Sequence, residues 1–181
     1  MPEKHPFPTC SILGVNIAVT NMKKTIAWLE EDISELSGSY ICISNVHTTV
    51  TAYEEESYRA VLNGAAAALP DGKPLSVTSR KHGFAEAERV TGPDLMGEIF
   101  RISARHGWRH YFYGSTEETL AALREALERT YPGIAIAGMY SPPFRPLIAE
   151  EDRENIERIN RAQADFIWIG LGAPKQEKWM A

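Results

Sequence analysis

The chain has 181 residues, which suits a single domain, and its hydrophobic fraction of 44% is ordinary for a protein with a buried core. A net charge of −5 argues against a general affinity for nucleic acid or for an anionic membrane. No apolar run approaches the roughly 18 residues that cross a bilayer, and the N-terminal stretch MPEKHPFPTC lacks the apolar core of a signal peptide. We therefore expect a cytoplasmic protein.

The cysteines and histidines give no sign of a metal site. Cys10 and Cys42 lie in strand-like stretches without a partner at metal-ligand spacing, so we expect two buried, reduced thiols. The five histidines do not cluster along the chain, and the sequence predicts no zinc site.

Helical and extended patterns alternate in the first half of the chain. Apolar residues at helical spacing follow the capping residue Asn21 and predict a helix over residues 22–36. The run YICIS predicts a strand over residues 40–44. A helix from about His47 is expected to pause at residues 54–56 and to resume to Asn63. The remaining predictions are a short strand over 65–70, a turn over 71–74 and a helix from there toward Lys81.

The same alternation continues in the second half. The predicted elements are a helix from Gly92 to about His106, a strand over 110–114, a helix opened by the capping box Ser115-x-x-Glu118, a strand over 134–139, a helix over 149–163 with Ile156 and Ile159 inside, and a strand over 166–170. Strands separated by helices predict right-handed crossovers. The expected fold is therefore α/β, a Rossmann-like, mostly parallel sheet with helices on both faces, in one domain over residues 1–181.

Ligands of open α/β sheets bind outside the carboxyl ends of the strands. Four loops follow predicted strands and are expected at one edge of the sheet: residues 45–49, residues 71–73, Gly114 with Ser115, and residues 170–176. Their shared position makes them a stronger signal together than each loop is alone.

The loop GLGAPKQ is the first candidate binding segment. Gly170 and Gly172 permit a tight turn close to a ligand, and Pro174 suits the start of a helix. Free N–H groups at a helix start, with the charge of Lys175, attract an anion such as a diphosphate. The alternative that these glycines only turn the chain stays open. The loop is no dinucleotide fingerprint, because Lys175 stands where G-x-G-x-x-G needs its third glycine, and it is no P-loop.

Polar residues in the other loops allow two interpretations each. Asp71 lies in a Pro-Asp-Gly turn and is either ordinary turn chemistry or a carboxylate that accepts a proton from a bound hydroxyl. Asn45 and Thr48 suit hydrogen bonds to a sugar or base, while Asn45 equally suits the cap of the following helix. Arg89 precedes a helix start and either neutralises phosphate or only solvates the surface.

Together these stretches resemble the WecG/TagA/CpsF glycosyltransferases, glycosyltransferase family 26. The resemblance is carried by PDGKPL, RVTGPDLM, HYFYGS, YPGIAIAGMYSPPF and DFIWIGLGAPKQEKWM, and it runs from about Ile12 to the end of the chain. The run GLGAPKQEKW is its most specific part.

The resemblance implies a bacterial enzyme that moves a sugar from a nucleoside diphosphate, usually UDP, to a lipid-linked sugar acceptor on polyprenyl diphosphate. The setting is the synthesis of a surface polysaccharide, an exopolysaccharide or a teichoic acid linkage unit. It also implies inversion at the anomeric carbon, no metal and no cofactor, and the absence of a D-x-D motif agrees. Asp71 would be the base and Gln176 would belong to the donor site. The other substrate-binding candidates are Asn45, His47, Thr48, Thr49, Gly72, Lys73, Arg89, Gly92, Asp94, Gly114, Gly170, Gly172 and Lys175.

The chain departs from the family pattern in two places. The family often has threonine two residues before the asparagine of its first loop, where this chain has Ile43, so we expect Ser44, Thr48 or Thr49 to supply that hydroxyl. The family also continues into a C-terminal tail that approaches the inner face of the plasma membrane. That tail is missing here, so we expect a truncated chain with weak donor binding and little turnover.

Two other function classes stay open beside the transferase. A nucleotide-binding regulatory module without catalysis would use the same loops, and a nicotinamide-dependent oxidoreductase is disfavoured by the missing third glycine. The sequence also leaves open whether the protein forms a homo-oligomer and which sugar it moves.

Overall fold

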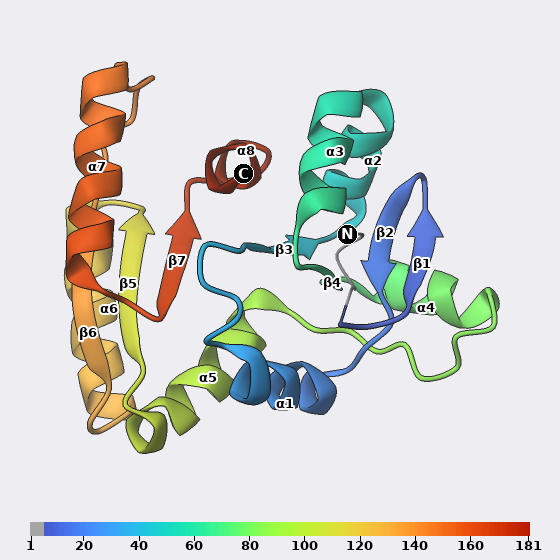
Figure 1. Cartoon of the computed structure of the whole chain (residues 1–181), viewed down its shortest axis with the longest axis horizontal. Coiled ribbons are helices and arrows are strands. Elements are labelled where there is room, and N and C mark those ends of the chain that lie inside the picture. The colour runs from blue at the N-terminus through green and yellow to red at the C-terminus, as the bar shows by residue number, and fades with distance from the viewer. Residues whose placement is uncertain (1–5) are drawn as a thin grey trace. The chain divides into compact units, whose positions relative to one another are not determined.

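The computed structural model describes residues 6–181. The chain forms two compact units (Figure 1). The first unit holds the chain up to Glu98 together with Ala173–Ala181, and the second holds Ile99–Gly172. The chain therefore passes between the units twice, once within the helix α5 (Gly92–His106) and once after Gly172.

The sheet of the first unit has the strand order β1-β2-β4-β3. Strands β1 (Thr9–Ile12) and β2 (Val15–Ala18) form an antiparallel hairpin around Leu13 and Gly14, both of which have positive φ angles. Strand β4 (Ala67–Pro70) pairs in parallel with both β2 and β3 (Ile41–Ser44). The sequence did not predict the hairpin, although a two-residue turn with glycine between apolar stretches is typical of one.

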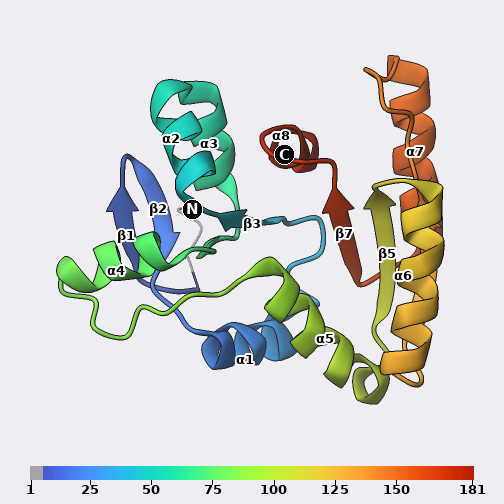
Figure 2. The ribbon, with the colours of Figure 1, turned by 180° about the vertical axis from the view of Figure 1, so that it is seen from behind.

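Helices cover this sheet and enclose the core of the first unit. Figures 1 and 2 both show α2 and α3 side by side, and α3 packs against β2 and β4. The helices are α1 (Met22–Asp32), α2 (Val46–Glu54), α3 (Glu56–Gly64), α4 (Lys73–Lys81), the first part of α5, and α8 (Lys175–Met180). Their buried side chains, among them Tyr58, Leu62 and Leu75, meet Val15, Ile17 and Cys42 of the sheet.

The sheet of the second unit has the order β6-β5-β7, and both of its pairings are parallel. Its strands are β5 (Arg109–Gly114), β6 (Ala135–Tyr140) and β7 (Phe166–Gly170). Helices α6 (Glu117–Thr130) and α7 (Ala149–Ala162) pack against β6, as the left side of Figure 1 shows. The second unit is thus built from parallel strands joined through helices, whereas the first adds an antiparallel hairpin to its parallel strands.

A neutral histidine lies at the centre of the aromatic core of the second unit. Trp168 Nε1 donates a hydrogen bond of 3.2 Å to His110 Nδ1, so Nε2 carries the proton and donates to Ser103 Oγ over 2.8 Å. The ring contacts Phe100 edge-on at 5.1 Å and stacks on Phe166 at 5.5 Å between centroids. Burial of His110 lowers its pKa to about 4, because the charged form would lose its water here.

The predicted α/β class with mostly parallel strands is confirmed. The strands nevertheless divide into two sheets, where the sequence suggested one. The predicted cap at Ser115 is wrong: Ser115 has a φ of 62°, and Thr116 is the N-cap of α6, accepting from Thr119 N. Ile156 is also 44% exposed, because Asn155 and Ile159 make up the inner face of α7.

Helix α1 is shorter than the sequence predicted, and no described helix is suited to cross a membrane. The predicted helix over 22–36 ends at Asp32, since residues 33–38 form turns that lead to Gly38 with a positive φ. Among residues 6–181, no helix has both the length and the apolar character that crossing a bilayer requires.

We predict that the His110 environment makes the protein acid-sensitive. The folded state lowers the pKa of His110 from 6.5 to about 4, so its stabilisation is complete above pH 6.5 and is lost as pH falls toward 4. Between pH 7.5 and pH 5 the free energy of unfolding should drop by about 2 kcal/mol on this account. Urea unfolding at both pH values measures the drop.

The matched variant is His110→Asn, whose amide oxygen can take the place of Nδ1 as the acceptor for Trp168 and which does not titrate. It should lose most of the drop, whereas His82→Gln, a change at an exposed histidine, should keep it. An equal acid response in all three proteins would contradict the assignment.

Candidate functional site

Three segments of the first unit meet where β3 and β4 end. The last paired residues are Ser44 and Pro70, and Asp71 N donates to Ser44 O over 2.7 Å. Val90 N donates to Pro70 O over 2.9 Å, which brings the segment containing Arg89 to the same edge. The structure therefore brings the predicted loops at Asn45 and Asp71 to the carboxyl edge of the sheet, where α/β proteins bind ligands, and the segment of Arg89 lies at the same edge.

Asp71 is half-buried and directly follows β4. Among residues 6–181, the structure gives its carboxylate no hydrogen-bond or ion-pair partner, so both oxygens can accept. Gly72 follows with φ 156° and ψ 133°, a conformation that side chains with a Cβ rarely adopt, and it precedes the first turn of α4. Lys73 is exposed at the start of that helix. The turn thus holds a carboxylate at a fixed point on the rim.

Asn45 caps helix α2. Its Oδ1 accepts from Thr48 N at 3.1 Å, and Thr48 Oγ1 accepts from Asn45 N at 2.9 Å, which completes a reciprocal capping box. Thr49 Oγ1 donates to Asn45 O over 2.6 Å. The capping interpretation of Asn45 is confirmed. Both buried threonine hydroxyls are used within this turn, while His47 is exposed beside them.

Ser44, one of the residues expected to supply a hydroxyl in place of the family's threonine, does not point to the same side of the sheet as Ile43. Neighbouring residues of a strand point to opposite faces, so Ile43 and Ser44 lie on opposite sides of the sheet. Ile43 faces Gly92, whose added Cβ would lie 3.8 Å from its side chain. Ser44 faces the same side as Cys42, and among residues 6–181 its Oγ is the one buried side-chain oxygen or nitrogen without a partner. Position 43 therefore offers an apolar surface toward Gly92.

Arg89 and Asp94 flank the start of α5. Arg89 Nη2 lies 3.9 Å from Asp94 Oδ2, and both side chains are more than half exposed. Thr91 Oγ1 accepts from Asp94 N over 3.2 Å and closes the first turn. An exposed pair at this distance is weak, so Arg89 can exchange its partner for a bound anion at little cost.

Gly114 and Gly170 lie side by side at the ends of β5 and β7 in the second unit. A Cβ on Gly114, which has a φ of 124°, would lie 2.3 Å from Gly170 O, so the close pairing requires glycine. Ser115 N donates to Gly170 O over 3.2 Å. This geometry supports the interpretation that Gly114 serves the fold. Gly172, with a φ of 81°, is the last residue of the second unit.

Lys175 and Gln176 belong to the first unit, on the short helix α8, which packs against α3. Lys175 is exposed and Gln176 is half-buried. Six residues give a small helix dipole, so positive charge at this end comes mainly from the Lys175 side chain. The sequence assigned no role to the next residue, Glu177, which is 1% exposed and accepts a hydrogen bond from Tyr58 OH. The one signal in the sequence that could have indicated a role for Glu177 is its position next to Gln176 in the motif.

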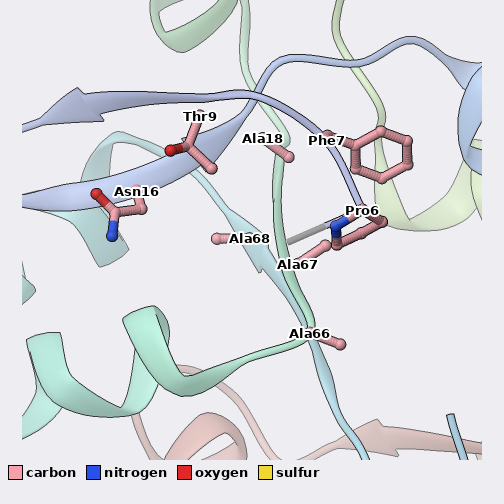
Figure 3. A pocket seen from close by; sticks show the side chains of 8 residues that line it. All are labelled: Pro6, Phe7, Thr9, Asn16, Ala18, Ala66, Ala67 and Ala68. Carbon is pink, nitrogen blue, oxygen red and sulfur yellow. The ribbon is translucent and has the colours of Figure 1, made fainter. Parts of the chain in front are cut away.

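Two hollows, one in each unit, are lined by none of the predicted site residues. Figure 3 shows a cavity between the β1-β2 hairpin and β4, lined by Phe7, Thr9, Asn16 and alanines of β4, with a volume of about 10 Å³. That is about enough for one water molecule. An open hollow of about 260 Å³ lies between α6 and the end of β6, beside Arg124 and Tyr140. Among residues 6–181, no three His, Cys, Asp or Glu side chains gather as a set of metal ligands.

Comparison with known proteins identifies the family of the chain. The model of the glycosyl transferase WecG/TagA/CpsF family matches residues 10–181. An N-acetylglucosaminyldiphosphoundecaprenol N-acetyl-beta-D-mannosaminyltransferase from Staphylococcus aureus (strain NCTC 8325 / PS 47) is 27% identical over 180 residues, which cover 98% of this chain and 69% of that protein. An enzyme of the same name from Bacillus spizizenii (strain W23) is 30% identical over 145 residues, which cover 80% of this chain and 54% of that protein. The chain belongs to the WecG/TagA/CpsF family of glycosyl transferases.

Proposed function

We propose that this protein moves a sugar from a UDP-sugar to a sugar carried on polyprenyl diphosphate, with inversion at the anomeric carbon and without a metal ion. The observation that carries the proposal is Asp71, a rim carboxylate without a partner among residues 6–181, between the segments of Asn45 and Arg89. Because the chain belongs to a glycosyl transferase family, we infer that this carboxylate acts in the transfer of a sugar.

Asp71 acts as the general base. An inverting transfer needs one group that takes the proton from the acceptor hydroxyl while its oxygen attacks the anomeric carbon from the face opposite the leaving group. The bond between that carbon and the phosphate oxygen breaks, and UDP leaves with the electron pair. The proton ends on Asp71. No covalent intermediate forms, so one carboxylate suffices.

Cationic side chains stabilise the leaving UDP. Negative charge grows on the diphosphate as the bond breaks, and donors fixed near that position lower the barrier. Arg89 offers a planar guanidinium that can bind two phosphate oxygens, and Lys175 and Lys73 offer ammonium groups. Gly72 belongs to the same donor site, together with Gln176. In this mechanism the cationic side chains neutralise the negative charge of the diphosphate, as a divalent cation does in other transferases.

The named relatives suggest the substrates. Both are named as enzymes that transfer N-acetylmannosamine to N-acetylglucosaminyldiphosphoundecaprenol. The donors to test therefore begin with UDP-N-acetylmannosamine, followed by other UDP-N-acetylhexosamines, on an N-acetylglucosamine acceptor linked to polyprenyl diphosphate. An acceptor with so long a hydrocarbon chain resides in a bilayer, so we place the protein at the membrane surface in bacterial cell-wall polysaccharide synthesis.

Asp71→Asn should reduce kcat by about 10²–10⁴-fold, because the amide cannot take the acceptor proton. The dissociation constant of UDP should change by less than about threefold, since the shape of the rim is kept. Transfer from a labelled UDP-sugar and calorimetry with UDP measure the two effects. The matched control is Asp32→Asn, at an exposed carboxylate that ends α1 and should leave both values unchanged. A full rate in Asp71→Asn would remove Asp71 from the role of base.

Arg89→Gln should raise KM for the UDP-sugar by about tenfold and also lower kcat, because Arg89 meets charge that increases in the transition state. Arg89→Lys should recover part of the loss. Steady-state kinetics in low and high salt measure these effects, with Arg124→Gln as the control at another exposed ion pair. Kinetics of Arg89→Gln that equal those of the wild type would exclude contact with the diphosphate.

Excess EDTA should leave the transfer rate unchanged, because arginine and lysine side chains neutralise the diphosphate in this mechanism. The measurement compares initial rates with and without chelator, and then after addition of Mg²⁺ or Mn²⁺. A rate that collapses in EDTA and returns with either cation would refute the metal-independent mechanism while leaving the transfer itself intact.

A further inference from the structure

Glu177 is a charged residue that the fold removes from water. It lies on α8 between exposed Lys178 and half-buried Gln176, yet it is 1% exposed. Among residues 6–181, no other Asp, Glu, Lys or Arg side chain is buried to this degree. Burying a carboxylate costs much free energy unless other groups replace its water. Its position therefore calls for an explanation.

Two side chains hold the carboxylate, one at each oxygen. Gln176 Nε2 donates to Glu177 Oε1 over 2.8 Å, and Tyr58 OH donates to Oε2 over 3.1 Å. Tyr58 is itself fully buried, and burial together with the charge of Glu177 raises its pKa. The phenol therefore stays protonated near neutral pH and remains a donor. The result is a chain of contacts from α3 through Glu177 to Gln176.

Anchoring α8 does not by itself require a charge at this position. Met180 of the same helix packs against the core cluster of the first unit, and Lys178 Nζ lies 2.8 Å from Glu55 Oε1 on its exposed side. An apolar side chain at position 177 would pack against α3 without the cost of desolvation. The carboxylate must therefore supply something that an apolar residue cannot.

The property that sets a carboxylate apart is that it only accepts hydrogen bonds. Its contact with Gln176 must come from the NH₂ end of the amide, which turns the carbonyl oxygen Oε1 to the opposite side. We propose that Glu177 is a positioning residue that sets the orientation of the Gln176 amide in the donor site. This inference rests on the proposed function, in which Gln176 belongs to the donor site.

The decisive variant is Glu177→Gln. It keeps the size of the side chain and removes the buried charge, but an amide at position 177 can offer either its oxygen or its NH₂ group to Gln176. We expect KM for the UDP-sugar to rise about tenfold with kcat changed less than about threefold, because binding and not proton transfer is impaired. The melting temperature should not fall, since no buried charge is left unpaired.

A double-mutant cycle separates positioning from anchoring. In a Gln176→Ala background, Glu177→Gln should have no further effect on KM, because the amide that it orients is absent. Lys178→Met, which removes the exposed ion pair of the same helix with Glu55, should leave KM unchanged. Unchanged KM in a stably folded Glu177→Gln enzyme, or an equal loss in both backgrounds, would overturn the proposal and leave Glu177 as an anchor.

If Glu177→Gln does not fold, Tyr58→Phe tests whether Glu177 positions Gln176. It releases one carboxylate oxygen but keeps the contact with Gln176, so KM should rise about two- to threefold and the rise should vanish in the Gln176→Ala background. A rise that persists there would overturn the proposal. These outcomes are distinct from a failure of the proposed function, which would appear as a wild-type protein that transfers no sugar from any UDP-sugar.

Discussion

The parallel pairing of β3 with β4 is the constraint on which the candidate site depends. Because both strands end together at Ser44 and Pro70, the residues that follow each strand emerge at the same point. The backbone bonds of Asp71 and Val90 to this end bind two further turns to it. A shift of the register by one residue would move Asp71 away from Asn45 and reverse the faces of Ile43 and Ser44. The chemistry of the rim is thus set by backbone hydrogen bonds.

The local parts of this arrangement could be predicted from the sequence, because their causes lie within a few residues. Asn45 caps its helix as its type and place suggest, and the helix pauses at Glu55, the cap between α2 and α3. The rule that ligands bind at the carboxyl ends of parallel strands predicted from the sequence alone that Asp71 and Asn45 lie at one edge of the sheet. The alternation of strands and helices gave the α/β class for the same reason.

The remaining features could not be predicted, because they depend on partners far apart in the chain. The division of the strands between two sheets is a matter of pairing, which periodicity along one strand does not encode. The cap at Thr116 was missed because Ser115 fits the same pattern, and only its positive φ excludes it. Glu177 looks like an ordinary helix-surface acid until Tyr58, 119 positions away, is placed beside it.

The buried carboxylate also affects the chemistry of Cys42. Burial raises the pKa of this thiol to about 12, and the negative charge of Glu177 adds to the effect. Thiolate is the form that attacks disulfides, alkylating agents and peroxides, and almost none is present at neutral pH. The side chain is also closed to solvent in the folded protein. Alkylation of Cys42 should therefore require the core of the first unit to open. The rate of alkylation then reports local unfolding near α8.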